Sequence, residues 1–108
     1  MFFAGQVKKR LTMLGEKLKE LRENKGFLQR QVAASLQVDS AYISKMEHDE
    51  KPVNRNHLKK LAKLYSISET ELLPLWLAAK VLQVIEKQEY GKEALKLVLN
   101  KLDNDKSK

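Results

Sequence analysis

The apolar residues of this chain recur at helical spacing along most of its length. Leucine, valine, isoleucine and methionine return every three or four residues, which places them on one face of successive short helices. The alternation of apolar and polar residues that marks a half-buried strand does not occur. The 108 residues include 4 glycines, 2 prolines and no cysteine, which argues against disulfide frameworks, thiolate metal sites and glycine-rich phosphate loops. We therefore expect a small all-α protein.

Six helical segments are expected, separated by turn and capping residues. Gly26 suits the left-handed end of the first helix. Asp39 or Ser40 can cap the third helix and Asn54 or Asn56 the fourth. Ser66 or Ser68 can cap the fifth, where Glu71 follows Ser68 at the spacing of a capping box and Pro74 is tolerated early in the helix or starts a new segment. The apolar rows that mark the six segments are 14–21, 28–36, 43–46, 58–64, 72–85 and 94–102.

The positive charge is concentrated in the first two-thirds of the chain. Residues 1–67 hold 14 lysines and arginines against 7 acidic residues, a net charge of +7, whereas residues 68–108 hold 7 of each. A polyanionic partner such as nucleic acid explains this asymmetry, and so does clustered solubility charge. We expect four parts: an N-terminal extension (1–12), a main domain (13–73), a C-terminal helical segment (74–102) and a polar tail (103–108).

Residues 28–47 have the pattern of two short helices joined by a tight turn, as a helix-turn-helix requires. Ala33 is small where the two helices cross, and Val38 can fill the space under the turn. Ile43 and Met46 anchor the second helix, so its other side faces solvent. That outward side carries small polar residues and one cation, without a carboxylate, and can enter a major groove: Ser40, Ala41, Tyr42, Ser44 and Lys45. An ordinary helical hairpin does not explain the missing carboxylates.

Residues 14–73 resemble the lambda-repressor-like helix-turn-helix family, also called the Cro/CI or XRE type. The motifs that carry the resemblance are Leu14-Gly15-Glu16-Lys17-Leu18, Leu28-Gln29 with Val32-Ala33, Tyr42-Ile43-Ser44-Lys45-Met46-Glu47, and Lys51-Pro52. The resemblance implies a compact five-helix domain, here with an additional C-terminal helix, that binds operator DNA as a dimer without catalysis. The chain departs from the family at Gln37 and Asp49, where glycine is frequent, and each departure costs up to about 1 kcal/mol if the backbone keeps a positive φ.

The resemblance also assigns roles to individual positions. The implied base-reading residues are Ser40, Ala41, Tyr42 and Lys45. The implied phosphate-binding residues are Gln29, Arg30, Lys51, Asn54 and Arg55. A structural ion pair is implied between Arg22 and Glu47. Physical chemistry agrees in two places, because a helix N-terminus next to Gln29 attracts phosphate and Lys45 can donate to guanine.

The segment 72–102 holds more apolar residues than one helix face can bury. One stripe on its first helix can pack against the main domain, whereas the second stripe needs another surface. The last helix can fold back over it, or a second subunit can cover it, and we expect the second subunit. The expected interface residues are Leu77, Val81, Leu82, Ile85 and Val98.

These features together predict a DNA-binding transcriptional regulator that recognises a palindromic operator as a homodimer. A restriction–modification controller, an antitoxin-like autoregulator and a phage-type repressor all fit. The alternative from another class is a protein-interaction adaptor that uses the helical fold as a scaffold. No catalytic, metal, cofactor or small-molecule site is expected, nor a membrane segment, and the expected location is the cytoplasm, at the nucleoid of a bacterium. Lys8-Lys9-Arg10 suits an arm that reaches along DNA or a solvated tail equally.

Overall fold

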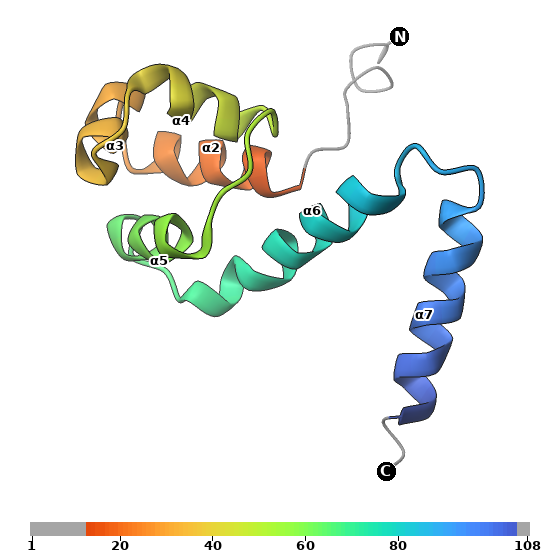
Figure 1. Ribbon diagram of the computed structural model, residues 1–108. Helices are drawn as coiled ribbons and strands as arrows, with labels where there is room; N and C mark the ends of the chain where they lie inside the picture. The colour runs from red at the N-terminus through yellow and green to blue at the C-terminus, as the bar shows by residue number, and fades with distance from the viewer. Residues whose placement is uncertain (1–12, 106–108) are drawn as a thin grey trace, which may run out of the picture. The chain divides into compact units, whose positions relative to one another are not determined.

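The computed structural model describes residues 13–105, and every regular element within that range is a helix (Figure 1). The expected all-α fold is therefore confirmed. The expected N-terminal extension, with Lys8-Lys9-Arg10, and the last residues of the expected tail lie outside the described range. In chain order the elements are α2 (Leu14–Asn24), α3 (Gln29–Leu36), α4 (Ser40–Glu47), α5 (Arg55–Leu64), the 3-10 helix η1 (Glu69–Glu71), α6 (Leu73–Ile85) and α7 (Gly91–Asp105).

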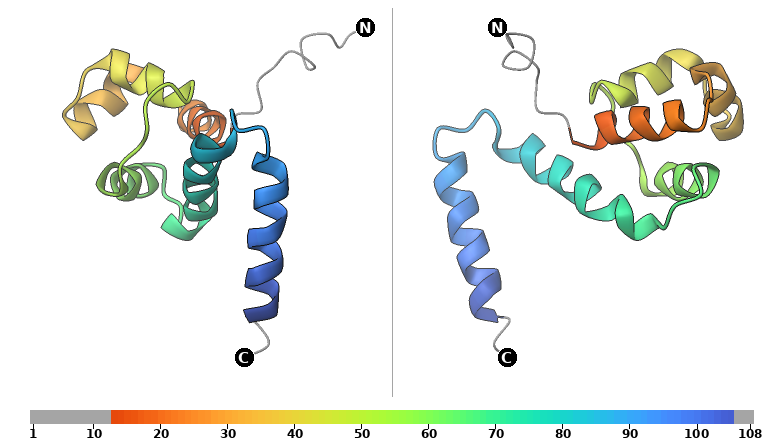
Figure 2. Two further views of the ribbon diagram at one scale, coloured as in Figure 1. Left: turned by 45° about the vertical axis from the view of Figure 1, so that its right-hand side comes forward. Right: turned by 180° about the vertical axis from the view of Figure 1, so that it is seen from behind.

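The chain forms two compact units, of which the first ends at Trp76 and the second begins at Leu77. The first unit holds α2 to α5, η1 and the first residues of α6. Helices α3 and α4 lie side by side, and α4 also packs against α2 (Figure 2). The second unit holds the rest of α6 and α7. Within residues 13–105 no helix has both the length and the apolar character that a membrane span needs.

One hydrophobic core fills the first unit, and it is built from the apolar rows of the sequence. Each helix from α2 to α5 turns its apolar stripe inward, and Leu72 closes the core from the residue before α6. Tyr65, just after α5, is also fully buried. Leu28 is an exception to the expected rows: it precedes α3 and is exposed. The core residues are Leu14, Leu18, Val32, Ala33, Leu36, Ile43, Met46, Val53, Leu58, Leu61, Ala62, Tyr65 and Leu72.

Capping side chains set the starts of α4 and α5, for each of which the sequence offers two candidates. Asp39 caps α4, where its Oδ1 accepts a hydrogen bond of 3.0 Å from the Tyr42 N–H. Asn54 caps α5 in the same way, accepting a bond of 2.8 Å from the His57 N–H. Helix α2 ends at Asn24, and the expected Gly26 follows two residues later. Its φ of 75° is a left-handed conformation that glycine adopts without strain.

The expected fifth helix is divided in the structure. Ser68 caps only the short turn η1, where its Oγ accepts a hydrogen bond of 3.2 Å from the Thr70 N–H. Among the hydrogen bonds of the described residues, none joins the Glu71 carboxylate to Ser68, so the expected capping box is wrong. Helix α6 begins at Leu73, and Pro74 lies in its first turn, where the missing N–H costs no intrahelical hydrogen bond.

The second unit leaves its apolar side chains largely uncovered. Helix α7 continues to Asp105, into the segment expected as a tail. Most large apolar side chains of this unit are exposed. They are Leu77, Val81, Leu82, Val84, Leu95, Leu97, Val98, Leu99 and Leu102.

Candidate nucleic-acid interface

Helices α3 and α4 are joined by a turn that depends on one residue with a left-handed backbone. Gln37 has φ 61° and ψ 43°, at the position where the family often has glycine. The Val38 N–H then donates to the Ala33 carbonyl at 3.0 Å, which reverses the chain. Ala33 is buried and Val38 half-buried at the crossing. The turn therefore has the expected form.

The exposed side of α4 begins at its N-terminus. Three of the four residues expected to read bases, Ser40, Ala41 and Lys45, are exposed. Helix α4 carries no carboxylate before Glu47, which points inward and is buried. A short helix with small N-terminal residues and an outward cation fits the width of a major groove.

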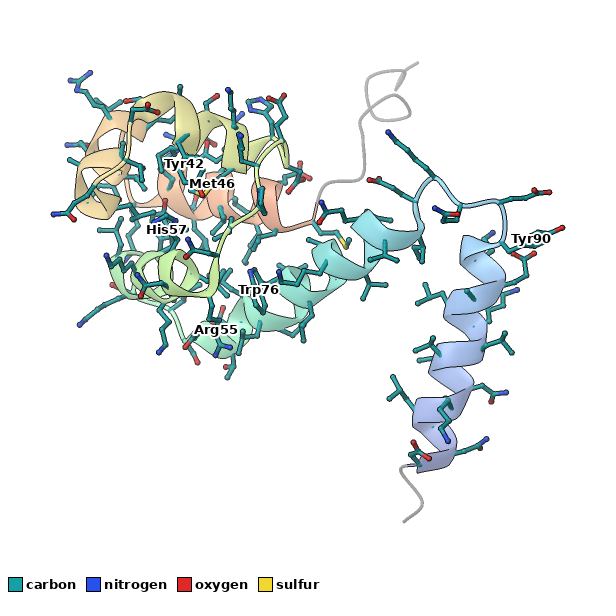
Figure 3. The ribbon with its side chains drawn as sticks, viewed as in Figure 1. Tyr42, Met46, Arg55, His57, Trp76 and Tyr90 are labelled. Carbon is teal, nitrogen blue, oxygen red and sulfur yellow. The ribbon has the colours of Figure 1, made fainter. Side chains whose placement is uncertain are left out.

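Tyr42 is the fourth residue expected to read bases, and the structure holds it against the protein. It is only half-exposed, and its Oη donates to the Pro52 carbonyl at 3.2 Å. Its ring lies edge-on to the His57 ring, with 5.8 Å between the centroids. Figure 3 labels Tyr42 on α4 and His57 on α5. Tyr42 thus ties α4 to the following loop, whereas the sequence suggested a side chain turned to solvent.

The C-terminal end of α4 is anchored by the ion pair that the family resemblance implies. The Arg22 Nε donates to Glu47 Oε2 at 2.7 Å and its Nη2 to Oε1 at 3.2 Å, which is a two-bond contact. The Arg22 Nη1 also donates to the Phe27 carbonyl at 2.9 Å. Arg22 is 8% exposed and Glu47 5%. The hydrogen bond to Glu47 is the main cause that raises the pKa of the Arg22 guanidinium, so Arg22 stays charged.

Gln29 lies at the start of α3, as a phosphate-binding residue would, but its amide contacts the same carboxylate. Its Nε2 donates to Glu47 Oε1 at 3.1 Å. An amide nitrogen has two hydrogens, so one hydrogen remains for a phosphate. Glu47 therefore connects three helices: it accepts from Arg22 on α2 and from Gln29 on α3 while it ends α4.

Two of the residues expected to bind phosphate, at the start of α5, already have structural contacts. The Asn54 Oδ1 is occupied by the cap of α5. The Arg55 Nε donates to Glu69 Oε2 at 2.7 Å, and its guanidinium carbon lies 5.8 Å from the centre of the Trp76 ring. The indole Nε1 of Trp76 donates to the Val53 carbonyl at 2.6 Å. Sequence analysis missed this contact of Trp76, because nothing local in the sequence places residue 76 beside residue 53.

The other cations of the proposed interface are available. Arg30, Lys45 and Lys51 are exposed, and none of them has an ion-pair partner among residues 13–105. In the same range, no three histidine, aspartate or glutamate side chains group as a metal site would need.

Asp49 has a role that the sequence analysis did not find. Its φ is 60°, as at a family glycine, and its Oδ1 accepts a hydrogen bond of 3.0 Å from the Gly15 N–H at the start of α2. Met13, which precedes α2, makes no side-chain cap. A Cβ at Gly15 would lie 2.5 Å from the Glu47 carbonyl oxygen, so only glycine fits there. The departure from glycine at Asp49 was the available signal, since aspartate tolerates this backbone and can also cap.

The residues expected at a dimer interface all lie in the second unit. Leu77, Val81, Leu82 and Val98 are exposed, and Ile85 is half-buried. The last helix was one candidate to cover them. Its own apolar side chains at Leu95, Leu99 and Leu102 are exposed as well, so the structure leaves both helices with uncovered apolar surface.

Residues 15–76 match the family model described as a helix-turn-helix domain. Over 60 residues the chain is 35% identical to the HTH-type transcriptional regulator ImmR of Bacillus subtilis (strain 168). The matched segment covers 56% of this chain and 47% of ImmR. The chain thus spans about half the length of this curated relative.

Two crystal structures of the clp gene regulator ClgR from Corynebacterium glutamicum are similar in fold. One has a TM-score of 0.54 and 25% identity, and the similarity covers 66% of this chain and 95% of that chain. The other has a TM-score of 0.55 and 26% identity, and the similarity covers 82% of this chain and 87% of that chain.

Proposed function

This chain belongs to the helix-turn-helix domain family of the XRE type, and we propose that it is a DNA-binding transcriptional regulator that acts as a homodimer on a palindromic operator. The relatives support the regulatory role, because ImmR and ClgR are both named as regulators. Its place of action is then the DNA of a bacterial cytoplasm.

The exposed side of α4 is the observation that carries this proposal. Ser40, Ala41 and Lys45 face outward, while the buried Glu47 at the other end fixes the helix to α2 and α3. Such a helix is rigid and enters a groove without rearrangement, which limits the entropy lost on binding. Lys45 can donate to guanine O6 or N7, and the Ala41 methyl can contact the methyl of thymine.

Phosphate contacts would then come from both sides of α4. Arg30 and the second amide hydrogen of Gln29 lie on α3, and Lys51 lies in the loop after α4. Arg55 contributes less than the sequence suggested, because Glu69 already neutralises its guanidinium.

The test compares two lysines with different roles. Lys45→Ala should cost about 1–3 kcal/mol on the site that the wild-type chain selects from random duplexes, and less on a scrambled duplex. Lys51→Ala should weaken both duplexes alike and make the salt dependence shallower. Dissociation constants measured over a salt series decide the matter. An equal loss on both duplexes for Lys45→Ala would make Lys45 a phosphate contact and remove the base-reading assignment.

A protein-interaction adaptor is the second candidate, favoured by the exposed apolar residues of the second unit. The same salt series separates the two. A regulator that neutralises phosphates loses affinity steeply as salt rises, whereas an adaptor that binds through apolar contacts should show no affinity for duplex DNA.

A further inference from the structure

The exposed side of α5 carries lysines and no acidic residue. No acidic residue occurs between Glu50 and Glu69, and lysines occupy positions 59, 60 and 63 of this stretch. All three lysines are exposed, while the opposite side of α5 is buried in the core. The exposed side of the helix is therefore a patch of positive charge, which we call the α5 lysine face (Lys59, Lys60 and Lys63).

No ion pair within residues 13–105 neutralises this charge. None of the three lysines has an ion-pair partner among residues 13–105. Helix α2 differs, because Lys17 and Lys19 alternate there with Glu16 and Glu20. Lys59 and Lys63 stand four residues apart on one side of α5, and like charges at this spacing destabilise a helix. An anionic partner would remove that repulsion.

The α5 lysine face continues the interface already proposed. Lys59 and Lys63 follow Arg55 by one and two turns, so the three cations form one row along α5. The row begins beside Asn54, in the loop proposed to contact phosphate, and extends about 12 Å along the helix axis. Its far end is thus two helical turns away from that loop.

We propose that the α5 lysine face binds the phosphate backbone of DNA that flanks the recognised site. The inference rests on the proposed function, and it extends the contact beyond the helix-turn-helix. Lysine suits this role, because it contacts phosphate as a mobile point charge and needs no fixed geometry. Such contacts add affinity and salt dependence without reading sequence.

The experiment uses two duplexes that share the site selected by the wild-type chain from a random pool. One duplex ends at the edges of the site, and the other continues for about 10 base pairs, one helical turn, on each side. The test variant is Lys59→Gln/Lys60→Gln/Lys63→Gln. The control is Lys17→Gln/Lys19→Gln/Lys25→Gln, which removes the same charge from α2 and from the residue directly after it. Glutamine is as good a helix former as lysine, and a thermal melt checks each fold.

The test variant should lose salt dependence only on the long duplex. The slope of log K against log salt should become shallower by about 0.9 for each lysine that contacts a phosphate. If the triple variant folds poorly, the single variant Lys63→Gln replaces it, and its slope should become shallower by about one such contact. The control should match the wild type on both duplexes.

Three results would overturn the proposal: an unchanged slope on the long duplex, an equal loss on the short duplex, or an equal loss in the control. Failure of the proposed function is a separate result, because it is read from the wild-type chain alone. If that chain selects no duplex from the pool, both proposals fall.

Discussion

Glu47 joins α4 to two neighbouring helices. Its carboxylate accepts hydrogen bonds from Arg22 and Gln29, and it is almost entirely removed from water. A buried charge pair of this kind adds little net stability by itself, but losing one member leaves the other charge unpaired. Glu47 therefore serves to fix one arrangement of α2, α3 and α4.

Replacing Glu47 by alanine should destabilise the fold strongly. We expect Glu47→Ala to lower the free energy of unfolding by about 3–5 kcal/mol, because the Arg22 guanidinium would stay buried without its partner. Glu23→Ala is the control, since Glu23 is also a charged neighbour of Arg22, with 4.0 Å between Arg22 Nη2 and Glu23 Oε2, but is exposed to solvent. Denaturant melts measure both variants. A loss of a few tenths of a kcal/mol for Glu47→Ala would mean that the pair contributes no more than a surface contact.

Tyr65 gives the fold a pH dependence at its alkaline limit. Burial raises the pKa of the Tyr65 phenol above its ordinary value of 10.0, and the Glu47 carboxylate raises it further. The folded state therefore keeps this proton after the unfolded chain has lost it. The resulting stability is complete below pH 10 and declines above it, by up to about 1.4 kcal/mol per pH unit.

This effect can be isolated by subtraction. The free energy of unfolding of wild type minus that of Tyr65→Phe should fall as the pH rises above 10. Tyr90→Phe provides the control, because Tyr90 is exposed, and its difference from wild type should stay flat. A flat difference for Tyr65→Phe as well would show that the phenol titrates alike in both states.

At the scale of elements, two turns with the same backbone conformation have different chemistry. Gln37 and Asp49 have φ values of 61° and 60°, and both stand where the family often has glycine. The structure gives Asp49 a bond to the Gly15 N–H, which offsets its backbone cost. For Gln37, no side-chain hydrogen bond is found among the described residues.

Glycine should therefore help at one turn and not at the other. Gln37→Gly should raise the free energy of unfolding by about 0.5–1 kcal/mol, because glycine takes this conformation freely. Asp49→Gly should gain the same backbone term but lose a cap of about 1 kcal/mol, so its net effect is near zero or destabilising. Chemical denaturation of both variants is the measurement. Equal gains would show that the Asp49 cap does not contribute.

The sequence predicted the elements well where the signal was local. Apolar spacing gave the helices, and short polar side chains gave the candidate caps at Asp39 and Asn54. It offered a new segment at Pro74 only as one of two alternatives and did not predict η1, because a 3-10 turn and a first α-helical turn have the same capping residues.

Contacts between distant residues account for the rest. The bond of Tyr42 to Pro52 makes a candidate surface group part of the scaffold, and the bond of Trp76 to Val53 joins the start of α6 to the loop before α5. Neither contact leaves a pattern in the local sequence. The Arg22–Glu47 pair was expected only through the family resemblance, since 25 positions separate the two residues.

At the scale of the whole molecule, charge and apolar surface are found on different parts of the chain. Residues 1–67 carry the net charge of +7, while residues 68–108 are neutral overall. The neutral part includes the exposed apolar side chains of the second unit. A homodimer joined through that unit would bring two copies of α4 to one duplex, and the second contact would then be intramolecular.

The dimer proposal predicts both an oligomeric state and an operator geometry. Leu82→Glu/Val98→Glu should give a folded monomer whose affinity for the selected duplex is lost or greatly reduced. Gln83→Glu/Asn100→Glu adds the same charge at exposed polar positions of the same helices and should stay dimeric. Light scattering and a DNA titration measure these outcomes. The sites that the wild-type chain selects should contain inverted half-sites whose centres are about 10 base pairs apart, or a multiple of that. If the apolar variant stays dimeric and binds normally, the interface lies elsewhere.

Trp76 is the one tryptophan of the chain, and its indole N–H is bonded to the carbonyl of Val53, inside the loop proposed to contact phosphate. Indole emission responds to the polarity and hydrogen bonding of its surroundings. The protein therefore carries an intrinsic optical reporter beside its proposed interface. Titrations can be followed by fluorescence on the unlabelled chain, without a dye that would alter its charge.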